Sequence, residues 1–121
     1  METNPLVRKF RKELNAGTVA LVLLATLARS GEEPLYGYQI AKRLEGLAAE
    51  GVPVKQGTLY PVLRSLEENG LLASRVEPSV SGPPRRYYGI TPAGRETLEL
   101  WTEAWMQTKR FVDGVVEENR D

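Results

Sequence analysis

The sequence predicts a mainly α (α+β) fold, in which a winged helix-turn-helix with a two-stranded β-wing is followed by one long C-terminal helix. Two helical segments joined by a short turn with glycine and proline, within residues 36–69, precede two strand-like segments, 71–76 and 85–90, and this order is typical of that fold. Apolar residues at helical spacing then continue from Leu98 to Val115. The 121 residues suffice for one compact domain with a modest core.

The N-terminal region is predicted to form two helices. A short amphipathic helix is indicated by three apolar residues that share one face: Leu6, Phe10 and Leu14. Gly17 is expected to break or bend it, and Thr18 to cap the next helix, which is apolar nearly all round over 19–27 and therefore buried. That helix is expected to end near Gly31, before a turn at 32–34.

The rest of the chain is predicted as two more helices, the wing and the final helix. The two helices cover about 36–49 and 56–69, and Pro61 is expected near the first turn of the second, where a missing N–H costs least. The two strand-like segments are separated by a loop, 77–84, that is too long for a two-residue hairpin turn. A threonine caps the final helix, which covers about 92–118.

The composition excludes several classes of site. Histidine and cysteine are both absent, which removes the commonest metal ligand, the commonest general base and the thiol nucleophile. We therefore predict no metal site, no cofactor and no enzyme activity. The 16 basic and 16 acidic residues cancel overall, but residues 1–30, 31–52, 53–91 and 92–121 carry +3, −2, +2 and −3. A balanced total does not exclude a nucleic-acid partner, because binding depends on the local field.

Basic residues precede the apolar run 19–28, a pattern that superficially resembles a secretion signal. Apolar residues at helical spacing interrupt the basic stretch, and removal of the run would strip the core. About 10 apolar residues are also fewer than the roughly 20 that span a bilayer. We therefore predict a cytoplasmic protein with no membrane partner, and a signal peptide is the alternative.

The helix predicted at 56–69 is the candidate for nucleic-acid recognition. Its N-terminal end carries residue types that contact bases and phosphates: Lys55, Gln56, Thr58, Tyr60 and Arg64. A helix N-terminus favours phosphate, and in a major groove Gln56 can pair with adenine while Arg64 reaches the backbone or a guanine. The alternative is a capped surface helix with a buried tyrosine.

The predicted wing carries Arg85 and Arg86 beside a flexible, uncharged stretch, 79–84. If Tyr88 and Ile90 point inward, strand alternation sends Arg85 and Tyr87 outward. A basic wing beside a helix-turn-helix can enter the minor groove or clamp phosphates. The alternative is a solvated surface pair of arginines.

Four stretches, in this order and spacing, resemble the PadR family of bacterial transcriptional regulators: Leu35–Ile40, Gly57–Pro61, Leu66–Leu71 and Gly82–Gly94. The resemblance implies a winged-helix dimer that binds double-stranded DNA and represses transcription, similar to the short-tailed branch with one helix after the wing. It also implies that Thr58 and Tyr60 contact DNA, with Arg64 further along. Arg85 and Arg86 match the basic wing of the family.

The final helix would be roughly 40 Å long, more than a body of about 90 residues can cover. It carries a heptad seam: Leu98, Trp101, Trp105, Thr108, Val112 and Val115. We predict a winged helix-turn-helix domain over 1–91 and a dimerisation helix over 92–121. The homodimer interface is expected to include Leu6, Phe10, Leu98, Trp101, Trp105 and Val112. The alternative is a helix folded back on its own domain.

The two tryptophans also suggest an effector site. Some drug-sensing members of the family hold flat aromatic ligands between tryptophans at the dimer centre, and Trp105 matches that position. The resemblance therefore implies a small planar aromatic effector at Trp101 and Trp105, with plain interface packing as the alternative.

Together these features predict a sequence-specific, ligand-responsive repressor that binds a pseudopalindromic operator as a homodimer. A winged-helix protein-interaction module without DNA binding is the second hypothesis. An enzyme is the third, and the lack of a glycine-rich phosphate loop and of a credible carboxylate pair disfavours it.

Overall fold

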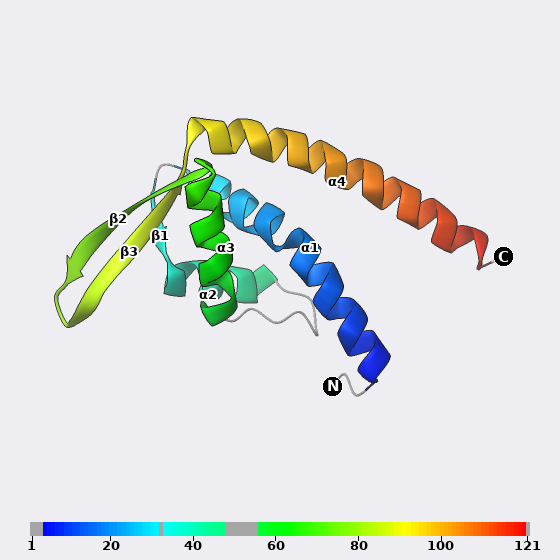
Figure 1. Ribbon diagram of the computed structural model, residues 1–121, viewed down its shortest axis with the longest axis horizontal. Coiled ribbons are helices and arrows are strands. Elements are labelled where there is room, and N and C mark those ends of the chain that lie inside the picture. The colour runs from blue at the N-terminus through cyan, green and yellow to red at the C-terminus, as the bar shows by residue number, and fades with distance from the viewer. Residues whose placement is uncertain (1–3, 32, 48–55, 121) are drawn as a thin grey trace.

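The computed structural model describes residues 4–31, 33–47 and 56–120. Within these ranges the elements follow one another as shown in Figure 1: α1 (Pro5–Arg29), β1 (Leu35–Tyr36), α2 (Gly37–Leu47), α3 (Gln56–Glu68), β2 (Leu72–Ser79), β3 (Gly82–Ile90) and α4 (Pro92–Glu118). A mostly helical chain with a small antiparallel sheet confirms the predicted winged-helix fold.

α1 is a single helix of 25 residues, so the predicted break at Gly17 is wrong. The side chain of its N-cap, Asn4, accepts hydrogen bonds from two backbone N–H groups of the first turn. The predicted cap at Thr18 is also wrong, because its hydroxyl donates to the Leu14 carbonyl oxygen at 3.1 Å, inside the helix. A glycine costs a helix interior only about 1 kcal/mol, which is too little to end a helix of this length. The helix ends before Gly31, whose φ of 70° favours glycine.

The sheet has three strands among the described residues, in the order β1-β3-β2, with antiparallel pairing throughout. Sequence analysis missed β1, in which Leu35 pairs with Tyr88 and Tyr36 pairs with Tyr87. Two residues are too few to show the alternation that identifies a strand. α2 begins at Gly37, one residue after the predicted start at about Tyr36, which lies in β1.

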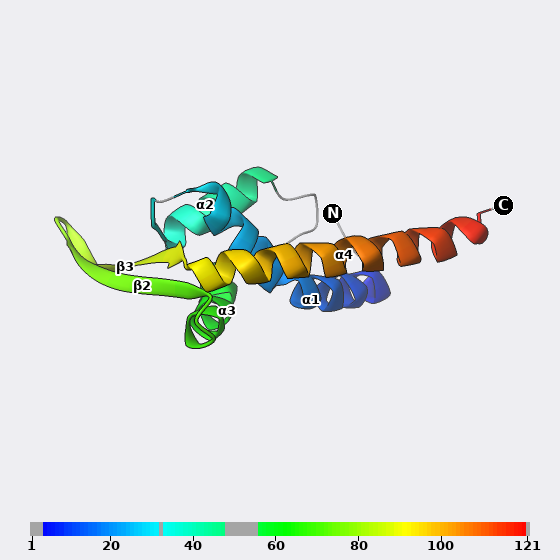
Figure 2. The same cartoon turned by 90° about the horizontal axis from the view of Figure 1, so that it is seen from above.

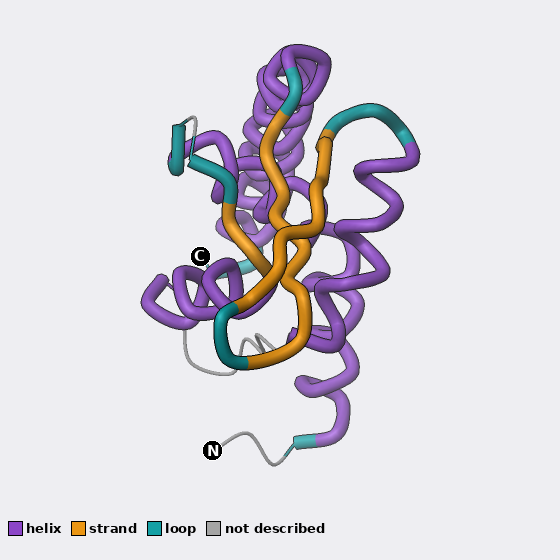
Figure 3. The backbone as a smooth tube through the Cα atoms, turned by 90° about the vertical axis from the view of Figure 1, so that its left-hand side faces the viewer, coloured by secondary structure: helices purple, strands orange, loops and turns teal. Residues whose placement is uncertain are grey.

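β2 and β3 form a longer hairpin than predicted (Figure 3). The predicted loop over 77–84 is wrong, since only Val80–Ser81 connects the two strands. The prolines suggested a loop because they cannot donate to a ladder. In the structure Pro83 and Pro84 lie opposite Pro78 at an irregularity in the register, where ladder hydrogen bonds are interrupted and proline is tolerated.

α3 matches the predicted helix closely, with one correction. Pro61 lies in the second turn and not in the first. It lacks the N–H that would bond the Gly57 carbonyl, and both residues are exposed, so water can reach that carbonyl. Gly70, with a φ of 78°, follows the helix as expected. The predicted end of the preceding helix, near Ala49, lies outside the described residues.

The core lies where α1, α2 and α3 meet the sheet. The largest fully buried side chains are Leu23, Leu24, Leu27, Leu35, Ile40 and Leu63. Each such side chain contributes roughly 1.5–3 kcal/mol through its removal from water. Tyr88, which is 4% exposed, closes the core from β3. Burial of 19–27 is not complete all round, because Val22 on the outer side is 40% exposed.

α4 begins as predicted, with Thr91 as its N-cap and Pro92 as its first residue. The Thr91 hydroxyl accepts from the Gly94 N–H at 2.9 Å and donates to the Gly70 carbonyl at 2.7 Å, so it joins the end of α3 to the start of α4. Gly94 is buried, and a Cβ there would overlap the Leu71 carbonyl oxygen. From this joint α4 runs beside α1, and its far end extends past the body (Figures 1 and 2).

Candidate nucleic-acid interface and apolar groove

The outer face of α3 is open to solvent. Tyr60 and Arg64 lie one turn apart on this face, and Thr58 is exposed in the first turn. Tyr60 is 39% exposed, so it is not the buried tyrosine of the alternative reading. The opposite face packs Leu59 and Leu63 into the core. This division follows from the helical period and places Tyr60 and Arg64 on the solvent-exposed side of α3.

The side chains of two predicted contact residues are not described by the structure. Lys55 lies outside the described residues, and only the backbone of Gln56 is described, as the first residue of α3. The three remaining residues of α3 and the two arginines of the hairpin are all exposed.

Tyr60 owes its position to a glycine on another helix. A Cβ added to Gly37, the first residue of α2, would lie 2.8 Å from Tyr60 Oη and 3.0 Å from its Cε1. Gly37 is buried, so the tyrosine ring occupies the space where a side chain would be. Sequence analysis missed this role, because a contact between residues on two different helices leaves no periodic pattern.

The two arginines of the wing point to opposite faces of the hairpin, as strand alternation requires. Arg86 faces α3: it donates to Ser74 Oγ at 3.0 Å, and the Ser74 hydroxyl donates to Glu67 Oε2 at 2.6 Å. This chain of hydrogen bonds ties both long strands to the end of α3. Burial raises the pKa of the neighbouring Tyr88 phenol, while the Arg86 guanidinium acts in the opposite direction. The phenol is therefore neutral at neutral pH.

Arg85 lies on the other face, against aromatic rings. Its guanidinium carbon lies 4.5 Å from the centroid of the Tyr36 ring. The Tyr36 ring in turn meets Tyr87 edge-on, with centroids 5.3 Å apart and planes at 66°. The prediction that Tyr87 points outward is therefore only half right. The Tyr87 side chain lies on the face of the hairpin away from that of Tyr88, but β1 brings Tyr36 against it, so Tyr87 is half-buried.

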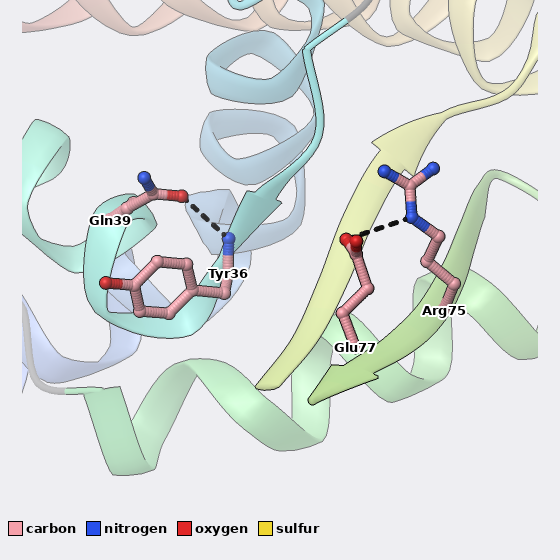
Figure 4. A network of polar contacts seen from close by, with 4 residues as sticks. All are labelled: Tyr36, Gln39, Arg75 and Glu77. Atoms are coloured by element: carbon pink, nitrogen blue, oxygen red, sulfur yellow. Dashed lines mark hydrogen bonds and ion pairs between the residues drawn. The ribbon is translucent and has the colours of Figure 1, made fainter. Parts of the chain in front are cut away.

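The aromatic row continues from Tyr36 onto α2. Tyr36 and Tyr38 stack with centroids 6.3 Å apart, and Lys42 Nζ lies 5.9 Å from the centroid of the Tyr38 ring. The Tyr36 N–H donates to Gln39 Oε1 at 3.1 Å, which fixes the start of α2 (Figure 4). The row thus joins the wing to the first turns of α2, and sequence analysis did not identify it.

One acidic residue of the wing is paired next to this row. Glu77 stands opposite Arg85 in the ladder, but its carboxylate accepts from Arg75 Nε at 3.1 Å on the same strand (Figure 4). Both side chains are largely exposed, so the ion pair contributes little to stability. It does partly neutralise the one carboxylate that lies directly across from Arg85.

A second feature is an apolar groove of about 520 Å³ between α1 and α4. Trp101 is half-buried and Trp105 is 38% exposed. The described residues that line the groove are Glu13, Leu14, Gly17, Thr18, Ala20, Leu21, Trp101, Ala104, Trp105 and Thr108. Glu13 alone among them carries a charge. Sequence analysis identified the two tryptophans but not the residues of α1 that face them.

The far parts of α1 and α4 expose large apolar side chains. Among the predicted interface residues, Leu6 is 77%, Phe10 62% and Val112 47% exposed. Leu98 instead packs against the core and is half-buried. Phe111, which is 71% exposed, belongs to the same region and was not predicted.

Among residues 4–31, 33–47 and 56–120, no group of three or more acidic residues is arranged to hold a metal ion. Over the same ranges, no helix is both long and apolar enough to traverse a bilayer.

Comparison with known proteins places the chain among regulators of transcription. Residues 23–100 match the model of the transcriptional regulator PadR-like family. The transcriptional regulator Rv3488 of Mycobacterium tuberculosis is 39% identical over 95 residues, which cover 78% of this chain and 85% of that protein. The crystal structure of a PadR family regulator from Eggerthella lenta has a TM-score of 0.78 at 35% identity and covers 93% of both chains.

A PadR-like regulator from Bacillus cereus is also similar, with a TM-score of 0.69 at 26% identity, covering 86% of this chain and 96% of the other. The stretch that matches the family model contains all of α3 and the whole hairpin, and so every described candidate contact. The relatives are regulators and not enzymes. This chain, likewise not an enzyme, belongs to the PadR-like family of transcriptional regulators.

Proposed function

We propose that the protein is a ligand-responsive repressor that acts in the cytoplasm and binds a pseudopalindromic operator as a homodimer. The observation that carries the proposal is the exposed face of α3, where Tyr60 and Arg64 lie one turn apart beside a hairpin with two arginines. Membership of a family of transcriptional regulators supports double-stranded DNA as the partner.

In this proposal α3 enters the major groove and the hairpin contacts the backbone or the minor groove. Arg64 reaches a guanine edge or a phosphate, and Gln56 pairs with adenine. The remaining proposed contacts are Lys55, Thr58, Tyr60, Arg85 and Arg86. The hydrogen-bond chain from Arg86 through Ser74 to Glu67 supports joint binding, because it holds the wing and α3 in one fixed arrangement.

A second copy of the chain is the proposed cover for the exposed apolar residues of α1 and α4. A stripe of this kind is unfavourable in water, and α4, at 27 residues, is roughly 40 Å long and reaches past its own body. A two-fold axis would present two α3 helices to successive turns of one duplex, about 34–36 Å apart.

The groove between α1 and α4 is the proposed effector site. Its volume of about 520 Å³ lies within the range of sites for small molecules. Trp101 and Trp105 offer flat apolar surfaces on which a planar aromatic ring can stack. Because Glu13 alone among the described lining residues is charged, a cationic aromatic ligand fits the groove better than an aromatic acid.

The test begins with selection of bound sequences from a random DNA pool, followed by anisotropy titrations of the selected duplex. Arg64→Ala is expected to weaken binding roughly ten- to a hundredfold, as loss of a base or phosphate contact requires, and Tyr60→Ala to weaken it as well. Arg120→Ala, which removes an exposed charge far from α3, is the control. Equal binding by all of these variants contradicts the assignment of α3.

The other parts of the proposal have separate readouts. Sedimentation that shows a monomer at micromolar concentration contradicts the homodimer. Tryptophan fluorescence that stays constant across a panel of planar aromatic cations contradicts the effector site and leaves the tryptophans as interface packing. A protein that is dimeric but selects no DNA sequence supports the protein-interaction module instead.

A further inference from the structure

We infer that Tyr36 is a positioning residue for DNA binding: its ring, held between the hairpin and α2, seats the Arg85 guanidinium so that this arginine is pre-arranged for a phosphate. The inference rests on the proposed function and deepens it. It adds a residue to the interface that would itself make no contact with DNA.

The first observation is the geometry of the stack. The Arg85 guanidinium carbon lies 4.5 Å from the centroid of the Tyr36 ring. A planar guanidinium over an aromatic face is a favourable contact that still leaves its N–H groups directed outward to other partners. Arg85 is exposed, so a phosphate oxygen can reach those groups.

The second observation is that the ring is held from several directions. Tyr36 pairs with Tyr87 in the ladder, and the two rings meet edge-on. Tyr38 stacks on Tyr36, with ring centroids 6.3 Å apart. The Tyr36 backbone N–H is bonded to Gln39 Oε1 at 3.1 Å. A ring fixed in this way can restrict a flexible arginine, whose side-chain entropy would otherwise oppose binding.

The third observation is the contrast with Arg86. That residue is held by hydrogen bonds on the opposite face of the hairpin, through Ser74 to Glu67. Each wing arginine therefore has its own support, one polar and one aromatic. The aromatic support uses no donor of the guanidinium, which leaves all of its donors for DNA.

The experiment is a double-mutant cycle on the full-length protein with its selected operator. Arg85→Gln is expected to weaken binding roughly a hundredfold for the two copies in a dimer and to reduce the slope of log K against log salt by about two. Tyr36→Leu is expected to weaken binding about five- to thirtyfold. It should change the salt slope by less than about one, because the arginine charge remains.

Two variants separate positioning from a merely structural role. Tyr36→Phe keeps the ring and is expected to bind within about twofold of the parent protein. In the Arg85→Gln background, Tyr36→Leu is expected to have no further effect. An equal loss from Tyr36→Leu in both backgrounds, or a loss with Tyr36→Phe as large as with Tyr36→Leu, overturns the inference.

A readout without DNA distinguishes failure of the inference from failure of the proposed function. In labelled protein, the Arg85 side-chain protons should show an upfield ring-current shift that Tyr36→Leu removes and Tyr36→Phe preserves. Absence of this shift in the parent protein overturns the stacking of Arg85 on Tyr36, and with it the inference. A parent protein that shows the shift but selects no DNA instead overturns the proposed function.

Discussion

The two ends of the molecule differ in how far their apolar side chains are exposed to solvent. In the winged-helix body, leucines from α1, α2 and α3 reach zero or near-zero exposure, and Tyr88 closes the core. In the distal half of α4 and the first turns of α1, comparable side chains such as Phe111 and Leu6 are more than two-thirds exposed, at 71% and 77%. The body is complete in one chain, whereas the helical end is apolar without being covered.

The difference shows which side chains are constrained by packing within one chain and which are not. A buried methyl group is constrained by neighbours on all sides, so added or missing atoms in the body change stability directly. An exposed apolar helix face has no such neighbours within its own chain, and only a second molecule that packs on it would constrain it. Substitutions in the distal helix should therefore act on assembly and leave the folding of the body unchanged.

Val112→Lys is the strongest test of this contrast. A lysine buried without a partner in the proposed homodimer interface is expected to destabilise that dimer by about 3–5 kcal/mol, while the far-ultraviolet circular dichroism of the helices is retained. Analytical ultracentrifugation over a range of concentrations measures the shift toward monomer. Glu103→Lys, on the polar face of α4, is the control, and equal dissociation of both variants would contradict the assigned seam.

Two glycines of the same helix provide the next test. Gly94→Ala is expected to cost about 1–3 kcal/mol, because its Cβ would overlap the Leu71 carbonyl oxygen and the Ile90 side chain. Gly114→Ala has open space around the added carbon and should gain about 0.5–1 kcal/mol from better helix propensity. Urea unfolding measures the change in the free energy of unfolding for each variant. A change of the same sign in both variants would contradict the prediction.

Gly37→Ala tests the body at the surface proposed to contact DNA. The added methyl group would meet the Tyr60 hydroxyl and ring, so the tyrosine must move from the face of α3. We expect operator affinity to fall about tenfold, within the range for a displaced base or backbone contact. Gly114→Ala is the control, because nothing lies near the Cβ position there and the residue is on α4, away from α3. Unchanged operator affinity of Gly37→Ala would contradict this role of Gly37.

The smallest expected effect concerns alkaline pH. Burial raises the pKa of Tyr88 above its ordinary value of 10.0, so the folded state holds the phenol proton more tightly than the unfolded state. This stabilisation is fully present below pH 10 and is lost as pH rises through the folded pKa. Tyr88→Phe should therefore flatten the loss of stability above pH 10 in unfolding experiments at successive pH values.

A pair on α4 is the contrasting case at the same pH. The hydrogen bond to Asp113 raises the pKa of Lys109, and both side chains are about half exposed. The sign is again a loss of stability as pH rises through the folded pKa. Because exposed pairs of this kind are worth little, Asp113→Asn should leave the alkaline unfolding curve unchanged within error.

Much of the fold could be predicted because its signals are periodic or local. The buried leucines of α3 follow the helical period, and Thr91 with Pro92 marks the start of α4 by capping chemistry. Errors arose where the local preference of a residue is too weak to decide the structure. Gly17 stays helical because one glycine costs a helix interior only about 1 kcal/mol, and the prolines of the hairpin are accommodated at a register irregularity.

The residues of the candidate site also fall into those that the sequence could predict and those that it could not. Tyr60, Arg64, Arg85 and Arg86 could be chosen by residue type and by their place on a helix or strand. The supports of those residues could not be chosen, because Gly37, Tyr36 and Glu67 act across elements that are distant in the chain. A single sequence shows which side chains are suited to a partner but not what holds them in place.

The hydroxyl of Thr91 has a mechanical consequence. It bonds to the last turn after α3 and to the first turn of α4 at once, and the overlap that a Cβ at Gly94 would cause leaves no slack beside it. Because α4 is about 40 Å long, a difference of about 5° in its direction at this joint would move its far tip by roughly 3–4 Å. The bonds of Thr91 therefore determine where the distal end of α4 lies relative to α3.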